Sequence, residues 1–67
     1  MNKFSNVLKE LREEKKLSQI QFAKEFNVSQ TTISGWETGY REPDFNTLIE
    51  IAKYFGVTTD YLLGLED

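Results

Sequence analysis

The sequence predicts an all-α fold of five short helices, and three observations lead to this prediction. Apolar residues recur at helical spacing, and capping residues and glycines fall at intervals suited to short helices. No segment shows the sustained alternation of apolar and polar residues that is typical of a strand. Because the chain has only 67 residues, we expect residues 1–67 to form one domain around one core.

The first two helices are predicted by periodicity and by a capping box. The first runs from about Phe4 to Lys15, with these apolar positions at helical spacing and Asn2 or Ser5 as its cap: Phe4, Val7, Leu8 and Leu11. The second opens with Ser18 as N-cap and Gln21 three residues later. Asn27 ends it, because Asn tolerates the left-handed conformation.

Three further helices are placed by their caps and by the glycines that end them. They are expected over Gln30–Glu37 between Ser29 and Gly39, over 45–55 between Asp44 and Gly56, and over 58–63 between Thr58 and Gly64. The pattern assigns these residues to the core: Phe22, Ala23, Val28, Ile33, Trp36, Phe45 and Leu48.

Composition excludes several classes of protein. The chain has no Cys and no His, which removes disulfides, thiolate metal sites, the commonest zinc ligand and the commonest general base. No paired carboxylate site is visible, so we expect no enzyme, no metal and no small-molecule cofactor. No apolar run is long enough to span a membrane, and the N-terminus does not resemble a signal peptide. A cytoplasmic protein is expected.

The net charge of −3 is distributed unevenly along the chain. Residues 1–16 carry five cations and three anions, whereas residues 44–67 carry one cation and five anions. A negative chain is unusual among proteins that bind nucleic acid, since basic patches usually attract the phosphates. The acidity lies in the last third, so the charge of the first part permits contact with DNA.

The second and third helices are predicted to form a helix-turn-helix over residues 18–38. Only Asn27, Val28 and Ser29 join them, which forces a sharp crossing instead of an antiparallel hairpin. A sharp crossing needs a small residue where the helices touch, and Ala23 meets that need. This geometry is typical of proteins that place the second helix of the pair in the major groove of DNA.

The third helix has one apolar and one polar face. Ile33 and Trp36 lie close together on the helical wheel and are expected to face the core. The opposite side is uncharged but rich in hydrogen-bonding groups, with Thr32 on its flank: Gln30, Thr31, Ser34 and Gly35. A Gln can bond adenine N6 and N7 together, and a Thr methyl can contact the thymine methyl. Gly35 is unfavourable inside a helix, and close approach of the backbone to the groove floor would explain it.

These residues together resemble a known family. The matching segments are Leu17-Ser18-Gln19, Phe22-Ala23, Val28 to Ser34, Trp36 to Gly39, Pro43, Leu48, Ile51-Ala52, Gly56-Val57 and Tyr61 to Gly64. They resemble the phage repressor/Cro-type, or XRE, helix-turn-helix family over about Leu8 to Gly64. The resemblance implies a λ-repressor-like domain that binds double-stranded operator DNA and regulates transcription, expected to be a repressor.

The resemblance also implies roles for individual residues. Gln30, Thr31 and Ser34 match base-reading positions, and Gln19 matches a residue that bonds a phosphate and braces Gln30. Arg12 and Glu37 match a buried ion pair. The residues expected to contact or support the DNA backbone are Gln19, Ser29, Thr32, Thr38, Tyr40 and Arg41. Apart from the resemblance, Lys15 or Lys16 is a candidate for a further phosphate contact; the alternative is that this charged run is only a solvated helix end. Two positions depart from the family pattern: Gly35, which often carries a base-reading side chain, and Glu42, in a loop that is often basic.

An apolar cluster near the C-terminus predicts a partner. A chain this short cannot easily bury all of these side chains, so they are candidates for a homodimer contact: Tyr61, Leu62, Leu63 and Leu65. Two copies would place two recognition helices about 34 to 36 Å apart on a palindromic operator. The alternative is that the last helix only covers the core. A second functional class also stays open, a protein-interaction module such as an antitoxin or anti-repressor partner whose acidic residues 44–67 bind a basic protein.

Overall fold

The computed structural model describes residues 2–66 and confirms the all-α fold. Within those residues it contains five helices and no strand: α1 (Phe4–Glu14), α2 (Gln19–Glu25), α3 (Gln30–Thr38), α4 (Phe45–Phe55) and α5 (Thr59–Leu62). The predicted boundaries therefore agree with the observed ones to within one or two residues. None of these helices is long and apolar enough to cross a lipid bilayer.

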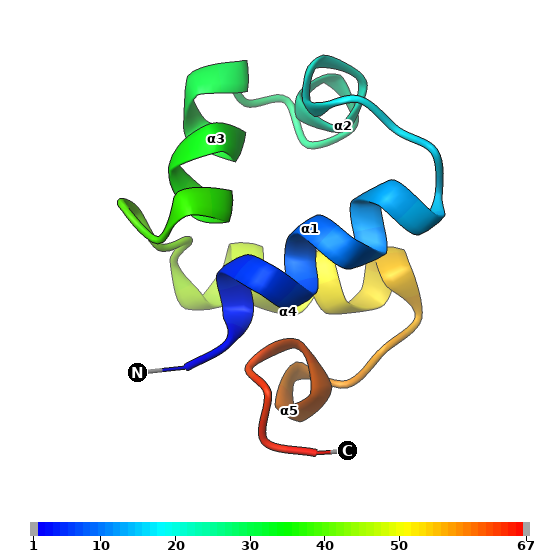
Figure 1. Cartoon of the computed structure of the whole chain (residues 1–67), viewed down its shortest axis with the longest axis vertical. Helices are drawn as coiled ribbons and strands as arrows, with labels where there is room; N and C mark the ends of the chain where they lie inside the picture. The colour runs from blue at the N-terminus through cyan, green and yellow to red at the C-terminus, as the bar shows by residue number, and fades with distance from the viewer. Residues whose placement is uncertain (1, 67) are drawn as a thin grey trace.

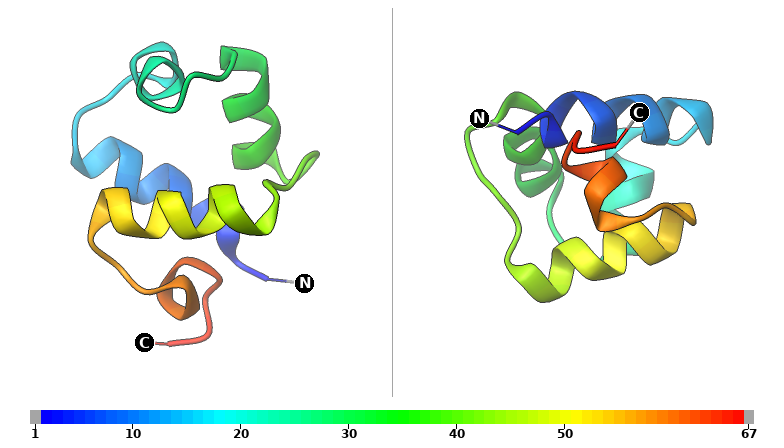
Figure 2. Two further views of the ribbon diagram at one scale, coloured as in Figure 1. Left: turned by 180° about the vertical axis from the view of Figure 1, so that it is seen from behind. Right: turned by 90° about the horizontal axis from the view of Figure 1, so that it is seen from below.

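α1 crosses the middle of the molecule on its near face in Figure 1. α2 and α3 lie together at one end of the molecule, and α5 lies at the opposite end. α4 lies on the opposite face of the molecule from α1, behind it in Figure 1 and in front of it in the left view of Figure 2. The backbone N–H of Lys3 donates to the carbonyl of Leu63 at 3.2 Å, which ties the beginning of α1 to the end of α5.

The predicted N-caps of the last four helices are confirmed. Each side chain accepts a backbone N–H of the first turn: Ser18 from Gln21, Ser29 from Thr32, Asp44 from Thr47 and Thr58 from Tyr61. The capping box between Ser18 and Gln21 is complete in both directions. At α1 the N-cap position is Lys3, and the Asn2 side chain accepts the N–H of Phe4 at 3.0 Å. Local sequence therefore determines where the helices begin.

The helix ends need residues at positive φ. Gly39, Gly56 and Asn27 adopt the left-handed conformation where the sequence predicted a stop, with φ of 81°, 68° and 55°. Lys16 also has a φ of 58°, at the end of α1, where no such residue was predicted. A left-handed lysine is unfavourable, because its Cβ crowds the backbone.

The core lies between α1, α2, α3, α4 and α5. Its fully buried large side chains come from all five helices: Leu8, Phe22, Ile33, Ile51 and Leu62. The ring of Phe22 also contacts three half-buried aromatic rings, those of Phe26, Tyr54 and Phe55. Trp36, at 4 % exposure, belongs to the core as predicted.

The prediction that Phe45 belongs to the core is wrong, because its side chain is 84 % exposed. Phe45 is the first residue of α4, and side chains of a helix lean back toward its N-terminus. Because α4 begins at Phe45, no preceding helical turn is available for the ring to pack against. Val28 and Leu48, also predicted as core, are half-buried and pack against its edge.

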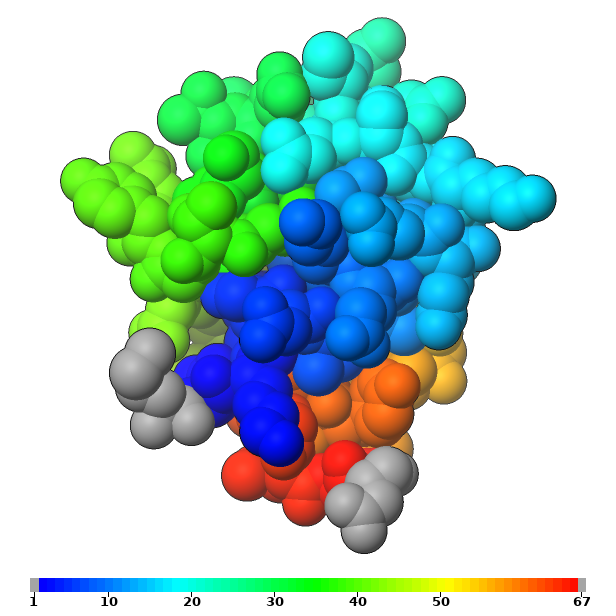
Figure 3. Space-filling model, in the orientation of Figure 1, coloured from blue at the N-terminus to red at the C-terminus, as the bar shows by residue number. Residues whose placement is uncertain are grey.

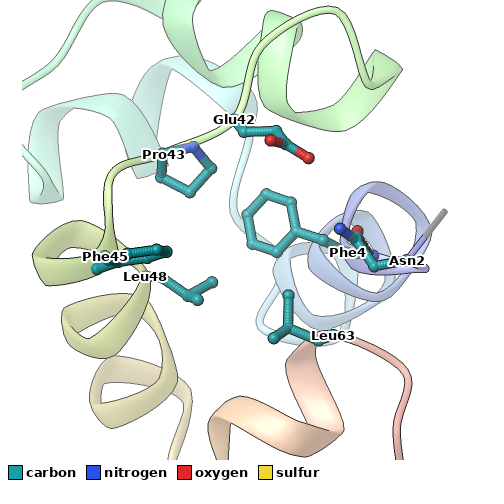
Figure 4. A pocket seen from close by; sticks show the side chains of 7 residues that line it. All are labelled: Asn2, Phe4, Glu42, Pro43, Phe45, Leu48 and Leu63. Carbon is teal, nitrogen blue, oxygen red and sulfur yellow. Dashed lines mark hydrogen bonds between the residues drawn. The ribbon is translucent and has the colours of Figure 1, made fainter.

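An open cavity separates the beginnings of α1 and α4. Its volume is about 230 Å³. Figure 4 shows Phe4 and Leu63 on one side of the cavity, facing Phe45 and Leu48 of α4 on the other, with Pro43 at its edge. Phe45 therefore lines a surface hollow and does not fill the core.

Candidate nucleic-acid interface

The turn between α2 and α3 is closed by backbone hydrogen bonds. The N–H of Val28 donates to the carbonyl of Ala23 at 3.0 Å, and the N–H of Asn27 donates to that of Lys24 at 3.3 Å. Ala23 is 3 % exposed, which gives the small contact residue that a sharp crossing needs. Residues 19–38 thus form a helix-turn-helix with α3 as its second helix.

A buried ion pair connects α1 with the C-terminal turn of α3. Arg12 Nε lies 2.6 Å from Glu37 Oε2, and Nη2 lies 3.0 Å from Oε1, so the contact is bidentate. The two residues are only 8 % and 9 % exposed. The hydrogen bond to Glu37 is the main reason that the pKa of Arg12 is raised. Arg12 Nη1 also donates to the carbonyl of Leu17 at 2.7 Å, a contact that the sequence did not predict.

Two glutamines extend this ion pair to the surface. Gln19 Nε2 donates to Glu37 Oε1 at 3.1 Å, and Gln30 Nε2 donates to Gln19 Oε1 at 3.3 Å. The four side chains form one continuous series from the buried Arg12 to the exposed first residue of α3. The structure therefore brings together the pair and the brace that the resemblance implied. The bond from Gln19 to Glu37 was not foreseen, because the sequence gives no measure of the distance between α2 and the end of α3.

The polar face of α3 is open at its N-terminal end. Gln30 and Thr31 are exposed, and Ser34 is half-buried. Ser29 Oγ accepts the N–H of Thr32 at 3.1 Å and lies 3.0 Å from its hydroxyl, so these two side chains hold the helix start. This arrangement leaves Gln30, Thr31 and Ser34 as the uncharged hydrogen-bonding groups on the outer side of α3, a surface hereafter called the α3 face.

The C-terminal half of α3 differs from the prediction at Gly35. This residue is buried, so its backbone is not open for approach to a groove floor. The side chain of Arg41 covers it: a Cβ placed on Gly35 would lie 3.0 Å from Arg41 Cγ and Cδ. The Thr38 hydroxyl donates to the Gly35 carbonyl at 3.3 Å, and Tyr40 is 85 % exposed in the segment that follows. The prediction failed because Arg41 lies beyond the end of α3. Helical periodicity does not show that the chain turns back and places this side chain over Gly35.

The apolar cluster around α5 is less open than the sequence predicted. Leu62 is fully buried, so the prediction that it contacts a partner is wrong. Tyr61 and Leu63 are half-buried and pack against the core, whereas Leu65 is 71 % exposed. α5 therefore covers the core, and only Leu65 of the predicted contact residues is largely exposed.

Four cations lie in or beside the motif: Lys15, Lys16, Lys24 and Arg41. Lys15 Nζ lies 4.8 Å from the centre of the Tyr54 ring, on the side of α1 that faces α4. Within residues 2–66, no three acidic side chains come together in a way that could hold a metal ion. The chemistry of this surface is hydrogen bonding by neutral side chains, with Arg41 at its edge.

Known proteins share both the sequence pattern and the fold. The Helix-turn-helix family pattern matches residues 8–62. The chain belongs to the helix-turn-helix family. It is 37 % identical over 60 residues to the HTH-type transcriptional regulator ImmR of Bacillus subtilis (strain 168), covering 90 % of the chain and 47 % of that protein. It is 44 % identical over 64 residues to the HTH-type transcriptional activator BcrR of Enterococcus faecalis, covering 96 % of the chain and 31 % of that protein. The chain thus spans about half or less of the length of these relatives.

A solved structure extends the likeness to three dimensions. The P22 c2 repressor, solved in complex with a synthetic operator, superposes with a TM-score of 0.84 at 28 % identity. The match covers 94 % of this chain and 96 % of the repressor chain. The resemblance to phage repressors drawn from the residues is confirmed.

Proposed function

We propose that this helix-turn-helix domain binds double-stranded operator DNA in a sequence-specific manner and regulates transcription, acting as a repressor. The observation that carries the proposal is the position of Gln30. It stands at the exposed start of α3, and hydrogen bonds through Gln19 connect it to the buried ion pair. A side chain held in this way is preorganised for a directional contact, which lowers the entropic cost of binding.

The α3 face suits the major groove. Its groups are neutral donors and acceptors, which can pair with base edges without the desolvation cost of a buried charge. We assign base reading to Gln30, Thr31 and Ser34. We assign support and contact with the DNA backbone to these residues: Gln19, Ser29, Thr32, Thr38, Tyr40 and Arg41. The likeness to a repressor solved with operator DNA supports this assignment.

We further propose that two copies bind a palindromic operator, and that they do so in the cytoplasm. Leu65 is the largely exposed member of the C-terminal cluster and offers an apolar side chain to a partner. Sedimentation at rising concentration should show association of the parent, and Leu65→Ser should weaken it. A parent that stays monomeric both alone and on the operator would contradict this part of the proposal.

The decisive experiment is selection of bound sequences from random duplex DNA, followed by titration of variants on the selected site. Gln30→Ala should cost about 1 to 3 kcal/mol on the selected site and should relax the preference at one base pair of each half-site. Its salt dependence should stay near that of the parent, because no charge is removed. Asn6→Ala is the matched control, since it truncates an exposed amide on α1, outside the motif.

Two results would overturn the proposal. If no duplex is enriched, the protein-interaction class becomes the better interpretation, and the acidic residues 44–67 become the surface to test against basic proteins. If Gln30→Ala and Thr31→Ala both bind all single-base variants as the parent does, the α3 face does not read bases.

A further inference from the structure

Gly35 is a socket for the side chain of Arg41. The Cβ, Cγ and Cδ atoms of Arg41 lie 3.0 to 3.2 Å from the point where a Gly35 side chain would begin. The backbone N–H of Arg41 donates to the Gly35 carbonyl at 3.1 Å, so the arginine backbone is fixed against the same residue. Both the backbone N–H and the aliphatic part of the Arg41 side chain are therefore fixed by contact with Gly35. The side chain of an exposed arginine ordinarily has no such contacts.

The guanidinium at the end of this stem is available for a ligand. Arg41 is exposed overall although its stem is packed, so the covered part is the aliphatic one. Among residues 2–66, the guanidinium forms neither an ion pair nor a side-chain hydrogen bond, and the one ion pair found there joins Arg12 to Glu37. The segment that follows α3 projects from the side of the molecule in Figure 3.

Gly35 also lies on the side of the helix that carries the α3 face. It follows Thr31 by four residues, and residues spaced by four lie on the same side of a helix. The stem of Arg41 packs against the Gly35 backbone, where any other residue would have a Cβ, next to the row of Gln30, Thr31 and Ser34.

We propose that Gly35 is a positioning residue for Arg41, and that the two together place a guanidinium at the C-terminal end of the α3 face to bind acceptor oxygens or nitrogens on DNA. This inference rests on the proposed function. The shared chemistry is bidentate donation from a planar cation, which either a phosphate or the O6 and N7 atoms of a guanine can accept. A Cβ at position 35 would press against this stem, which would have to shift by a few tenths of an ångström to make room.

A double-mutant cycle on the selected operator tests the pairing. Arg41→Ala should weaken binding about ten-fold, the usual effect of losing a charge-assisted hydrogen bond. Gly35→Ala should weaken binding at least about three-fold while leaving the thermal midpoint equal or higher, since Ala favours a helix more than Gly. In the Arg41→Ala background, Gly35→Ala should change affinity by less than about two-fold, because the Gly35 effect acts through Arg41. Two-fold is about the scatter expected in a double-mutant cycle.

Arg41→Met is the matched control, because it keeps an unbranched stem in the socket and removes only the charge. It should weaken binding as Arg41→Ala does, and Gly35→Ala should have no added effect on it. A phosphate ligand is indicated if Arg41→Met weakens all operator variants alike and lowers the log-log salt slope by about 1. A guanine ligand is indicated if the preference at one base pair relaxes.

The outcomes separate the two proposals. If the parent selects an operator but the losses from Gly35→Ala and Arg41→Ala multiply, the pairing is refuted and the proposed function stands. If Arg41→Met binds as the parent does, the guanidinium has no ligand and the inference fails. If the parent enriches no duplex, the proposed function fails and this inference fails with it.

Discussion

α1 meets its neighbours on two sides that differ in packing. Toward α3 it presents Arg12, which is paired, hydrogen-bonded and nearly inaccessible to water. Toward the start of α4 it presents Phe4, which borders a cavity of about 230 Å³ with the exposed ring of Phe45 on the far wall. The first contact includes a buried polar pair with matched partners, whereas the second is mostly apolar and incompletely filled.

This comparison shows that burial and partners, more than residue type, determine how much a side chain contributes to the stability of the fold. A buried charge is costly to leave unpaired, so the stability of the α3 side depends on each partner of the pair. An exposed phenyl ring removes little area from water, so the α4 side depends on Phe4 and hardly on Phe45. Two predictions test this contrast directly, and two smaller ones test the ends of the helices that meet there.

The largest effect is expected on the polar side. Arg12→Met should destabilise the fold by about 3 to 5 kcal/mol, because Glu37 would keep a buried charge without a partner. Lys9→Met, the same change at an exposed position of α1, should shift stability by less than about 0.5 kcal/mol. Urea titration measures both. Adding Glu37→Leu to Arg12→Met should restore part of the loss, and equal small effects of Arg12→Met and Lys9→Met would contradict a buried pair.

The next largest difference in stability is expected between variants of the two phenylalanines that line the cavity. Phe4→Ala removes a ring that is 3 % exposed and should cost about 3 kcal/mol. Phe45→Ala removes a ring on the opposite wall that is 84 % exposed and should cost less than about 0.5 kcal/mol. Thermal midpoints of the two variants compare them directly. A large loss for Phe45→Ala would mean that the cavity closes around this ring in solution.

A smaller and stabilising effect is expected from a substitution at the end of α1. Lys16→Gly should stabilise the protein by about 0.5 to 1 kcal/mol, since its φ of 58° is unfavourable for lysine and free of strain for glycine. Asn27→Gly, at a φ of 55°, should gain less because Asn tolerates this conformation better. If the two changes have equal effects on the urea midpoint, backbone strain at Lys16 is not the cause.

The smallest effect concerns the cap of α4 and appears only in acid. The pKa of Asp44 is lowered because its carboxylate accepts the backbone N–H of Thr47, with the Thr47 side chain as a second cause. A depressed pKa in the folded state gives stability that is present above the unfolded value of about 3.9 and is lost as the pH falls below it. Asp44→Asn should therefore flatten the fall of the thermal midpoint as the pH drops below about 4.

Asp60→Asn is the control for that measurement, because the carboxylate of Asp60 accepts no hydrogen bond from residues 2–66. It should leave the acid limb of the stability profile as it is in the parent. An unchanged acid limb in Asp44→Asn as well would show that the cap does not depend on the charge.

Local interactions made much of this protein predictable from its sequence. Ser18, Ser29, Asp44 and Thr58 begin helices because each side chain can satisfy a free N–H only three residues away. Gly39 and Gly56 end helices because they adopt positive φ without strain. Such interactions span less than one helical turn, so they can be predicted without knowing the fold. The exposed polar residues of α3 follow from the same periodicity.

Tertiary structure decided where segments distant in the sequence meet. Phe45 shares a helical face with core residues but lies beyond the contact with α1, and Leu62 completes the core although it belongs to the last short helix. Gly35 is covered by Arg41, a residue outside its helix, and the bond from Gln19 to Glu37 depends on how far apart two helices pack. Periodicity states which side of a helix is apolar, but only the packed neighbours determine whether that side is covered and by what.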